Sequence, residues 1–209
     1  RGRGNSYYAD WKLGDKVWTD AVPTGCLLIH QSILKTIWEN SEKYNAMGRE
    51  VKKVFELPHV EGYEDYVSIH IRLGDYKIHS GSFPPITEHY ILLAALEIQR
   101  AYPEIKFMVF SDGIEECKEM FQSNFSQAFN DRAEFSEGRN ELQDLSLMAS
   151  CGHHIIANSS FSWWAAYLGH NPNRIVVCPS ASTWFGPTCG VKQPVNDLIL
   201  PEWIQIDTR

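Results

Sequence analysis

The sequence predicts an α/β fold: a Rossmann-like parallel sheet domain over residues 66–209, preceded by a small, mainly helical region over residues 1–65. From Tyr66 onward, short β-rich runs alternate with helical patterns at the spacing of βαβ units. Polar residues follow several of these runs, at the strand ends where such a sheet binds its ligands. The pattern therefore predicts both the sheet and a ligand site at its carboxyl edge.

Residues 1–24 show no clean period, and we expect a loop there with at most a short strand; helical spacing begins at about Cys26. One apolar stripe consists of Leu27, Gln31, Leu34 and Trp38. A second stripe begins at Val51, after Met47-Gly48. We expect two helices here, with a linker over residues 58–64.

The elements of the sheet domain follow from periodicity and from proline and cap signals. Pro84-Pro85 and Thr87 mark a helix start, and Pro103 ends the same helix. Asn140 is the expected cap of a later helix. The expected elements are strand 66–72, helix 87–102, strand 105–110, helix 114–121, strand 133–135, helix 140–151, strand 152–157, helix 163–168 and strand 174–178.

The turn that begins at Asn158 joins a strand to an apolar helix. Asn158, Ser159 and Ser160 are residue types that cap helices. Such a turn directs unpaired N–H groups and the positive end of the helix dipole at one point, which suits a phosphate or diphosphate. The alternative is an ordinary capped core helix.

A second polar segment, His70-Ile-Arg-Leu-Gly-Asp-Tyr, ends the first strand. His70 and Arg72 lie two apart and share a face of the strand. The guanidinium fork of Arg72 matches phosphate oxygens, Gly74 permits a sharp turn, and Asp75 is placed to orient the basic groups. The alternative is a strand-end salt bridge between Arg72 and Asp75, with His70 in the core.

Composition limits the class of ligand. The 209 residues are 44% hydrophobic and carry a net charge of −7, so we expect no nucleic-acid partner, and a nucleotide-sized anion must meet a local set of donors. The five cysteines are widely spaced, which favours reduced thiols over a metal site. The apolar runs are too short to cross a bilayer.

The chain opens with Arg1-Gly-Arg-Gly rather than methionine, which suggests a piece of a larger chain. A cytoplasmic location is favoured, and a Golgi lumenal one fits an excised domain.

Three segments in this order resemble the α-1,2-fucosyltransferases of glycosyltransferase family 11. They are His70-Ile-Arg-Leu-Gly-Asp-Tyr, then Phe110-Ser-Asp, then Asn158-Ser-Ser-Phe-Ser-Trp-Trp-Ala-Ala-Tyr-Leu. The likeness covers residues 66–186. It implies a GT-B fold whose C-terminal half binds GDP-fucose, and an inverting transfer of fucose to a glycan hydroxyl without a metal or other cofactor.

The resemblance also implies roles for single residues. Arg72 would hold the β-phosphate of the leaving GDP, and Asp144 would recognise the guanine. The residues expected to bind the donor are His70, Arg72, Asp112, Asp144, Asn158, Ser160, Phe161, Ser162 and Trp163. Asp75 is the candidate general base, with His79 and Glu88 as alternatives.

The sequence departs from the family at two points. Leu73 stands where the family usually has a second arginine, which predicts one cationic group fewer near the phosphates. The glycine-rich N-terminal segment of the family is absent, so residues 1–65 are expected to be a reduced or truncated acceptor half. Two alternatives follow: a glycosyltransferase with another nucleotide sugar, or a non-catalytic nucleotide- or glycan-binding module.

Overall fold

The structure, a computed structural model, describes residues 43–46, 49–52, 57–129, 131–190 and 195–208. The chain divides into two compact units, Arg1–Phe55 and Glu56–Arg209. In the first unit, β1 (Lys43–Ala46) and β2 (Arg49–Lys52) pair as antiparallel strands, with Tyr44 opposite Val51. The prediction of a helix starting at Val51 is therefore wrong, because Val51 lies in β2. The stripe predicted over residues 27–38 lies outside the described residues.

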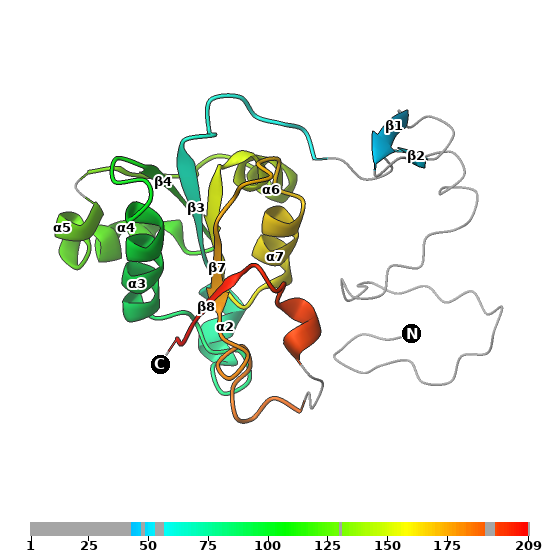
Figure 1. The fold of residues 1–209 in the computed structure, drawn as a ribbon. Helices are drawn as coiled ribbons and strands as arrows, with labels where there is room; N and C mark the ends of the chain where they lie inside the picture. Colours follow the sequence, from blue (N-terminus) through cyan, green and yellow to red (C-terminus); the bar gives the residue numbers. More distant parts are fainter. Residues whose placement is uncertain (1–42, 47–48, 53–56, 130, 191–194, 209) are drawn as a thin grey trace. The chain divides into compact units, whose positions relative to one another are not determined.

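The second unit holds a six-stranded sheet and its covering helices (Figure 1). Its elements are β3 (Tyr66–Ile71), α2 (Gly74–Ile78), α3 (Glu88–Gln99), β4 (Lys106–Ser111), α4 (Ile114–Ser123), α5 (Ser126–Phe129), β5 (Ala133–Phe135), α6 (Glu141–Ser150), β6 (His153–Ile155), α7 (Ser160–Tyr167), β7 (Val176–Pro179), the 3₁₀ helix η1 (Val195–Leu198) and β8 (Ile204–Ile206).

The strand order is β5-β4-β3-β6-β7-β8, and every neighbouring pair is parallel. Numbered along the chain within this sheet, the order is 3-2-1-4-5-6, that of the Rossmann fold. The predicted Rossmann-like parallel α/β fold is confirmed.

Helices cover both faces of the sheet, with α3 and α4 on one side and α6 and α7 on the other (Figure 1). The side chains of β3 alternate between the two cores. Ile69 and Ile71 pack in the cluster that includes α3, whereas Tyr66 packs in the cluster that includes Leu147 and Met148 of α6. Because both faces are covered, β3 is buried at every position, as central parallel strands are.

Two helix starts agree with the cap signals in the sequence. The Thr87 side chain accepts a hydrogen bond from the Tyr90 N–H and begins α3. Asn140 and Gln143 form a reciprocal capping box at α6, with bonds of 2.9 and 3.0 Å. These caps fix where the chain leaves the carboxyl ends of the strands and turns back along the sheet.

Candidate functional site

The candidate site follows from the strand order. The chain runs from β3 outward to β5, then returns to β6 and continues to β8 on the other side. The loops after β3 and β6 therefore turn away from each other, and ligands of such sheets bind at this switch point beyond the carboxyl ends of the strands. Arg72 directly follows β3, and Asn158 follows β6.

Two contacts place these loops side by side. The ring of His70, on β3, lies 5.5 Å from the ring of Phe161, on α7, between centroids. The Tyr76 hydroxyl, on α2, donates to the backbone oxygen of Asn158 at 2.8 Å. The two polar segments singled out in the sequence thus meet at one end of the domain.

Arg72 lies between two carboxylates. Its Nε and Nη2 approach Oδ1 of Asp75 at 2.9 and 2.8 Å, and its Nη1 lies 3.1 Å from Oδ2 of Asp112. The Arg72 side chain is 37% exposed, so an anion from solvent can reach it. Both alternatives for this motif, salt bridge and accessible phosphate ligand, are therefore compatible with the geometry.

Asp112 shapes the turn that carries Arg72. Its Oδ1 accepts the N–H of Leu73 at 2.8 Å and its Oδ2 accepts the N–H of Gly74 at 3.0 Å. A Cβ on Gly74 would lie 2.5 Å from that same Oδ2, so only glycine lets the carboxylate approach this closely. Asp112 therefore fixes the backbone of the turn and also pairs with the Arg72 guanidinium.

Leu73 does not face the site. Its side chain is 6% exposed and packs in the hydrophobic cluster of the α3 face, next to Gly113. The Leu73 side chain therefore lies in the core, whereas the Arg72 side chain is partly exposed.

The N-terminus of α7 supplies backbone donors. Its cap residue, Ser159, makes no side-chain hydrogen bond to the helix. The first-turn N–H groups, those of Ser160, Phe161 and Ser162, therefore have no side-chain cap. The N–H of Trp163 already donates to the Ser159 oxygen at 3.0 Å, so that donor belongs to the helix.

Three predicted donor ligands on this segment turn their side chains inward. The fully buried Ser162 hydroxyl donates to the oxygens of Ser159 and Ala157, at 3.3 and 3.5 Å. The Asn158 amide donates to the backbone oxygens of Pro84 and Trp184, at 3.1 and 2.9 Å. The Trp163 ring stacks on Tyr167 at 4.9 Å and packs near Trp203.

Through these contacts Asn158 connects its own loop to two others. Its side chain joins the segment before α3 to the segment after β7, and its backbone oxygen receives Tyr76. Of the three predicted capping residues, Ser159 takes the N-cap position of α7, without a side-chain hydrogen bond to the helix.

His70 is buried at the base of the site. Burial, followed by the charge of Arg72, lowers the pKa of His70 from 6.5 to about 4. Its Nδ1 is buried without a hydrogen-bond partner among the described residues. His70 is therefore neutral at pH 7 and supplies an aromatic and dipolar surface rather than a charge.

Asp144 lies toward the other edge of the sheet. It accepts a hydrogen bond from the Ser136 hydroxyl, directly after β5, and Arg139 donates to the same hydroxyl at 3.1 Å. Ser136 follows β5, which lies two strands from β3, so the Asp144 carboxylate is anchored beside a different strand end from the one that carries Arg72.

Tyr76 is the site residue that the sequence did not single out. Its ring centroid lies 5.9 Å from Cζ of Arg72, and its hydroxyl reaches the α7 loop. Its signal in the sequence was its place as the last residue of the segment His70-Ile-Arg-Leu-Gly-Asp-Tyr, which received no role of its own.

The described ranges hold neither a metal cluster nor a membrane-spanning helix. No group of three or more His, Cys, Asp or Glu residues there could hold a metal ion. No helix there is long and apolar enough to cross a membrane. The four cysteines described, Cys117, Cys151, Cys178 and Cys189, are free thiols.

Comparison with known proteins identifies the family. The model of glycosyl transferase family 11 matches residues 37–207. The chain belongs to this family. The motifs on which the resemblance rested all lie inside the matched region, so the predicted family is confirmed.

Several known proteins are about one-third identical to this chain over the residues that align. An alpha-1,2-colitosyltransferase of Escherichia coli is 33% identical over 71% of this chain and 54% of its own length. The O-antigen biosynthesis glycosyltransferase WbnK of Escherichia coli is 33% identical over 66% and 44%. Human galactoside alpha-(1,2)-fucosyltransferase 1 is 31% identical over 49% and 28%. The chain thus spans about half the length, or less, of these relatives.

Proposed function

We propose that this chain is the donor-binding part of an inverting α-1,2-fucosyltransferase that uses GDP-fucose and a glycan hydroxyl and needs no metal. One observation carries the proposal. Arg72 and the α7 N-terminus, which has no side-chain cap, lie on the two loops that flank the sheet's switch point, held together by the Tyr76–Asn158 bond. A guanidinium and converging amides suit a diphosphate.

The chemistry follows from charge at the leaving group. When the bond from the sugar to the β-phosphate breaks, negative charge grows on the diphosphate. Arg72 and the first-turn N–H groups of α7 are fixed donors that gain strength as this charge develops, which lowers the barrier. In this proposal they supply the stabilisation that a divalent cation supplies elsewhere.

The guanine end is assigned to Asp144. A carboxylate accepts from the N1 and N2 donors of guanine, and Asp144 is hydrogen-bonded to Ser136 at the end of β5, two strands from β3. The neutral, buried ring of His70 lies on β3, two residues before Arg72, and contacts Phe161, where it would border the nucleoside.

Asp75 is the proposed base for the acceptor hydroxyl. Both bonds from Arg72 end on its Oδ1, and the side chain is 55% exposed. Its Oδ2 is therefore open to an incoming hydroxyl. An inverting displacement needs this base on the side of the sugar opposite the departing diphosphate.

A second donor needs a direct test because one relative is named a colitosyltransferase. Colitose lacks the 3-hydroxyl of fucose. A site built to bond that hydroxyl would reject the colitose donor strongly, whereas an apolar pocket would accept both. The remaining alternative, a non-catalytic binding module, is motivated by the partial coverage of the relatives.

The test measures binding and turnover on the whole chain. Calorimetric titration with GDP, UDP and dTDP should show GDP as the tightest, and GDP-fucose turnover should persist in EDTA. Arg72→Lys should weaken GDP binding by about ten-fold or more, because an ammonium cannot replace the bidentate fork. Arg100→Lys is the matched control, since Arg100 pairs with Glu97 at the exposed end of α3.

Three results separate the alternatives. Binding of UDP but not GDP would overturn the fucose assignment. Equal GDP affinity in the Arg72→Lys and Arg100→Lys variants would overturn the phosphate role of Arg72. GDP binding without sugar release, with or without galactoside acceptors, would favour the binding module.

A further inference from the structure

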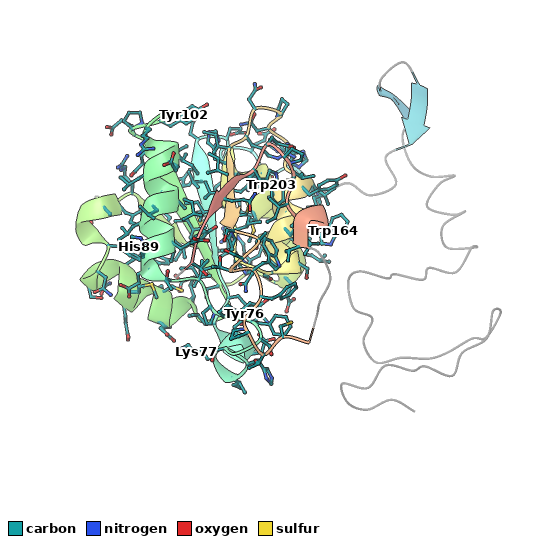
Figure 2. All side chains as sticks on the ribbon, turned by 60° about the horizontal axis from the view of Figure 1, so that its bottom comes forward. Tyr76, Lys77, His89, Tyr102, Trp164 and Trp203 are labelled. Atoms are coloured by element: carbon teal, nitrogen blue, oxygen red, sulfur yellow. The ribbon has the colours of Figure 1, made fainter. Side chains whose placement is uncertain are left out.

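Tyr76 contacts both halves of the proposed diphosphate site. Its ring lies beside the Arg72 guanidinium, at 5.9 Å from Cζ to centroid. Its hydroxyl donates to the Asn158 oxygen at 2.8 Å, one residue before the cap of α7. Figure 2 shows Tyr76 at the end of the domain where α2 lies.

We propose that Tyr76 is a positioning residue that sets the separation between Arg72 and the α7 amides, and so the affinity of the site for a second phosphate. The proposal rests on the proposed function, because it assigns this role within the same diphosphate site. Tyr76 itself acts through Arg72 and the Asn158 backbone.

The surroundings of Tyr76 hold its ring in one place. The Phe83 ring stacks on it at 5.6 Å with 30° between the planes, and Phe83 in turn contacts the Phe185 ring at 6.0 Å. Burial raises the pKa of the Tyr76 phenol, so the hydroxyl stays a protonated donor at neutral pH. An aromatic side chain has only two torsions, so a ring that is held at both ends is a stiff spacer.

The need for a spacer follows from the secondary structure. Asp112 fixes the backbone of the turn after Arg72, but α2, which follows that turn, is a helix of five residues with no buried side chain. The α7 amides belong to a different loop, and Asn158 lies 82 positions after Tyr76 in the chain. Non-covalent contacts between the two loops therefore decide whether the Arg72 guanidinium and the α7 amides can both reach one diphosphate.

The experiment compares GDP with GMP, because their affinity ratio isolates the β-phosphate. Tyr76→Phe removes only the hydroxyl bond. We expect it to weaken GDP binding about three- to ten-fold while GMP binding changes less than about two-fold, as one lost hydrogen bond predicts. Tyr76→Leu also removes the ring beside Arg72 and should reduce the GDP-to-GMP preference further.

Tyr66→Phe is the matched control. The Tyr66 hydroxyl also makes a hydrogen bond, to Oε1 of Glu134 at 2.7 Å, but it lies at the opposite end of β3. This variant should leave the GDP-to-GMP ratio unchanged. Because Tyr76 is only partly buried and lies outside the core clusters, both Tyr76 variants should keep the wild-type thermal transition within a few degrees.

Two results would overturn the role of Tyr76: an equal loss of GDP and GMP affinity in Tyr76→Phe, or no loss of either. A preference that shifts equally in Tyr66→Phe would overturn it too. Failure of the proposed function is a separate outcome, seen as absent sugar release from GDP-fucose by the wild-type chain. The nucleotide ratios are scored independently of that release.

Discussion

Gly74→Ala tests whether the turn after β3 is built around Asp112. Propensity alone predicts a gain, because alanine stabilises helical positions by up to about 1 kcal/mol over glycine and Gly74 opens α2. The structure predicts the opposite. The added Cβ would lie 2.5 Å from Oδ2 of Asp112, so the carboxylate must move.

The size of the loss follows from the bonds that Asp112 makes. Its oxygens accept two backbone N–H groups, at 2.8 and 3.0 Å, and pair with Arg72 at 3.1 Å. Hydrogen bonds to charged groups contribute about 1.5–3 kcal/mol each, at the lower end for a partly exposed carboxylate such as this one. Losing one bond and straining the others predicts a destabilisation of about 2 kcal/mol.

The assay is urea unfolding of the whole chain, combined with GDP titration. Gly190→Ala is the control, because an added Cβ there meets nothing within 4 Å. Asp112→Ala supplies the double-mutant cycle: once the carboxylate is gone, Gly74→Ala should cost nothing further. A neutral Gly74→Ala, or a full additive loss in the double variant, would refute the argument.

Two further predictions concern residues next to Arg72. The pKa of His70 is about 4 in the folded chain and 6.5 in the unfolded chain. Between these pH values the unfolded chain binds a proton that the folded chain does not. The free energy of unfolding should therefore fall by up to about 3 kcal/mol as the pH drops from 6.5 to 4. Urea unfolding midpoints at about pH 7 and pH 4.5 measure this loss of stability. His70→Gln should make stability depend less steeply on pH, and the contribution of His154, whose pKa in the folded chain is about 3, should remain. Leu73→Arg should lower the free energy of unfolding by about 3 kcal/mol without tightening GDP binding, since position 73 is buried beside Gly113. Urea unfolding measures the first effect and calorimetric GDP titration the second. Tighter GDP binding at unchanged stability would contradict the prediction.

The strands and long helices of the sheet domain could be predicted because their burial leaves a strong pattern. β3 is buried on both faces, and four of its six residues are β-branched or aromatic. Asn140 is the cap expected from residue type alone, and it caps α6 in the structure. Here local chemistry and tertiary packing favour the same element.

Elements without such a pattern were missed. α2 has no buried residue, and its Ile78 is 80% exposed, so no apolar stripe marks it. β8 has three residues and exists through its pairing with β7. The β1–β2 pair had a usable signal, a two-residue Met47-Gly48 separation typical of hairpins, but the apolar spacing from Val51 favoured a helix.

The candidate residues were predicted more readily than their partners. Residue types and spacing single out Arg72, Asp112 and Asn158, but their functions depend on contacts distant in sequence. Asp112 binds the turn 38 and 39 positions before it, and Asn158 binds oxygens 74 positions before and 26 positions after it. Only the folded topology brings these partners together, so a ligand role and a positioning role look identical in the sequence.

The division of donors between two loops explains why positioning residues are prominent in this site. In dinucleotide-binding Rossmann domains, a glycine-rich turn and a helix after the first strand hold the phosphates together. Here the first strand, β3, is followed by the five-residue α2, and the longer α7, whose N-terminus has no side-chain cap, follows the fourth strand. One loop supplies the guanidinium and the other supplies the amides.

Charge cannot replace geometry in such an arrangement. Arg72 with Asp75 and Asp112 carries one positive and two negative charges, a sum of −1, in a chain whose net charge is −7. A diphosphate at the proposed site would therefore not be attracted by the overall field, and it would have to compete with Asp75 for the guanidinium. Its binding would then depend on directional donors held at the right separation, which is the role proposed for the Tyr76 bond.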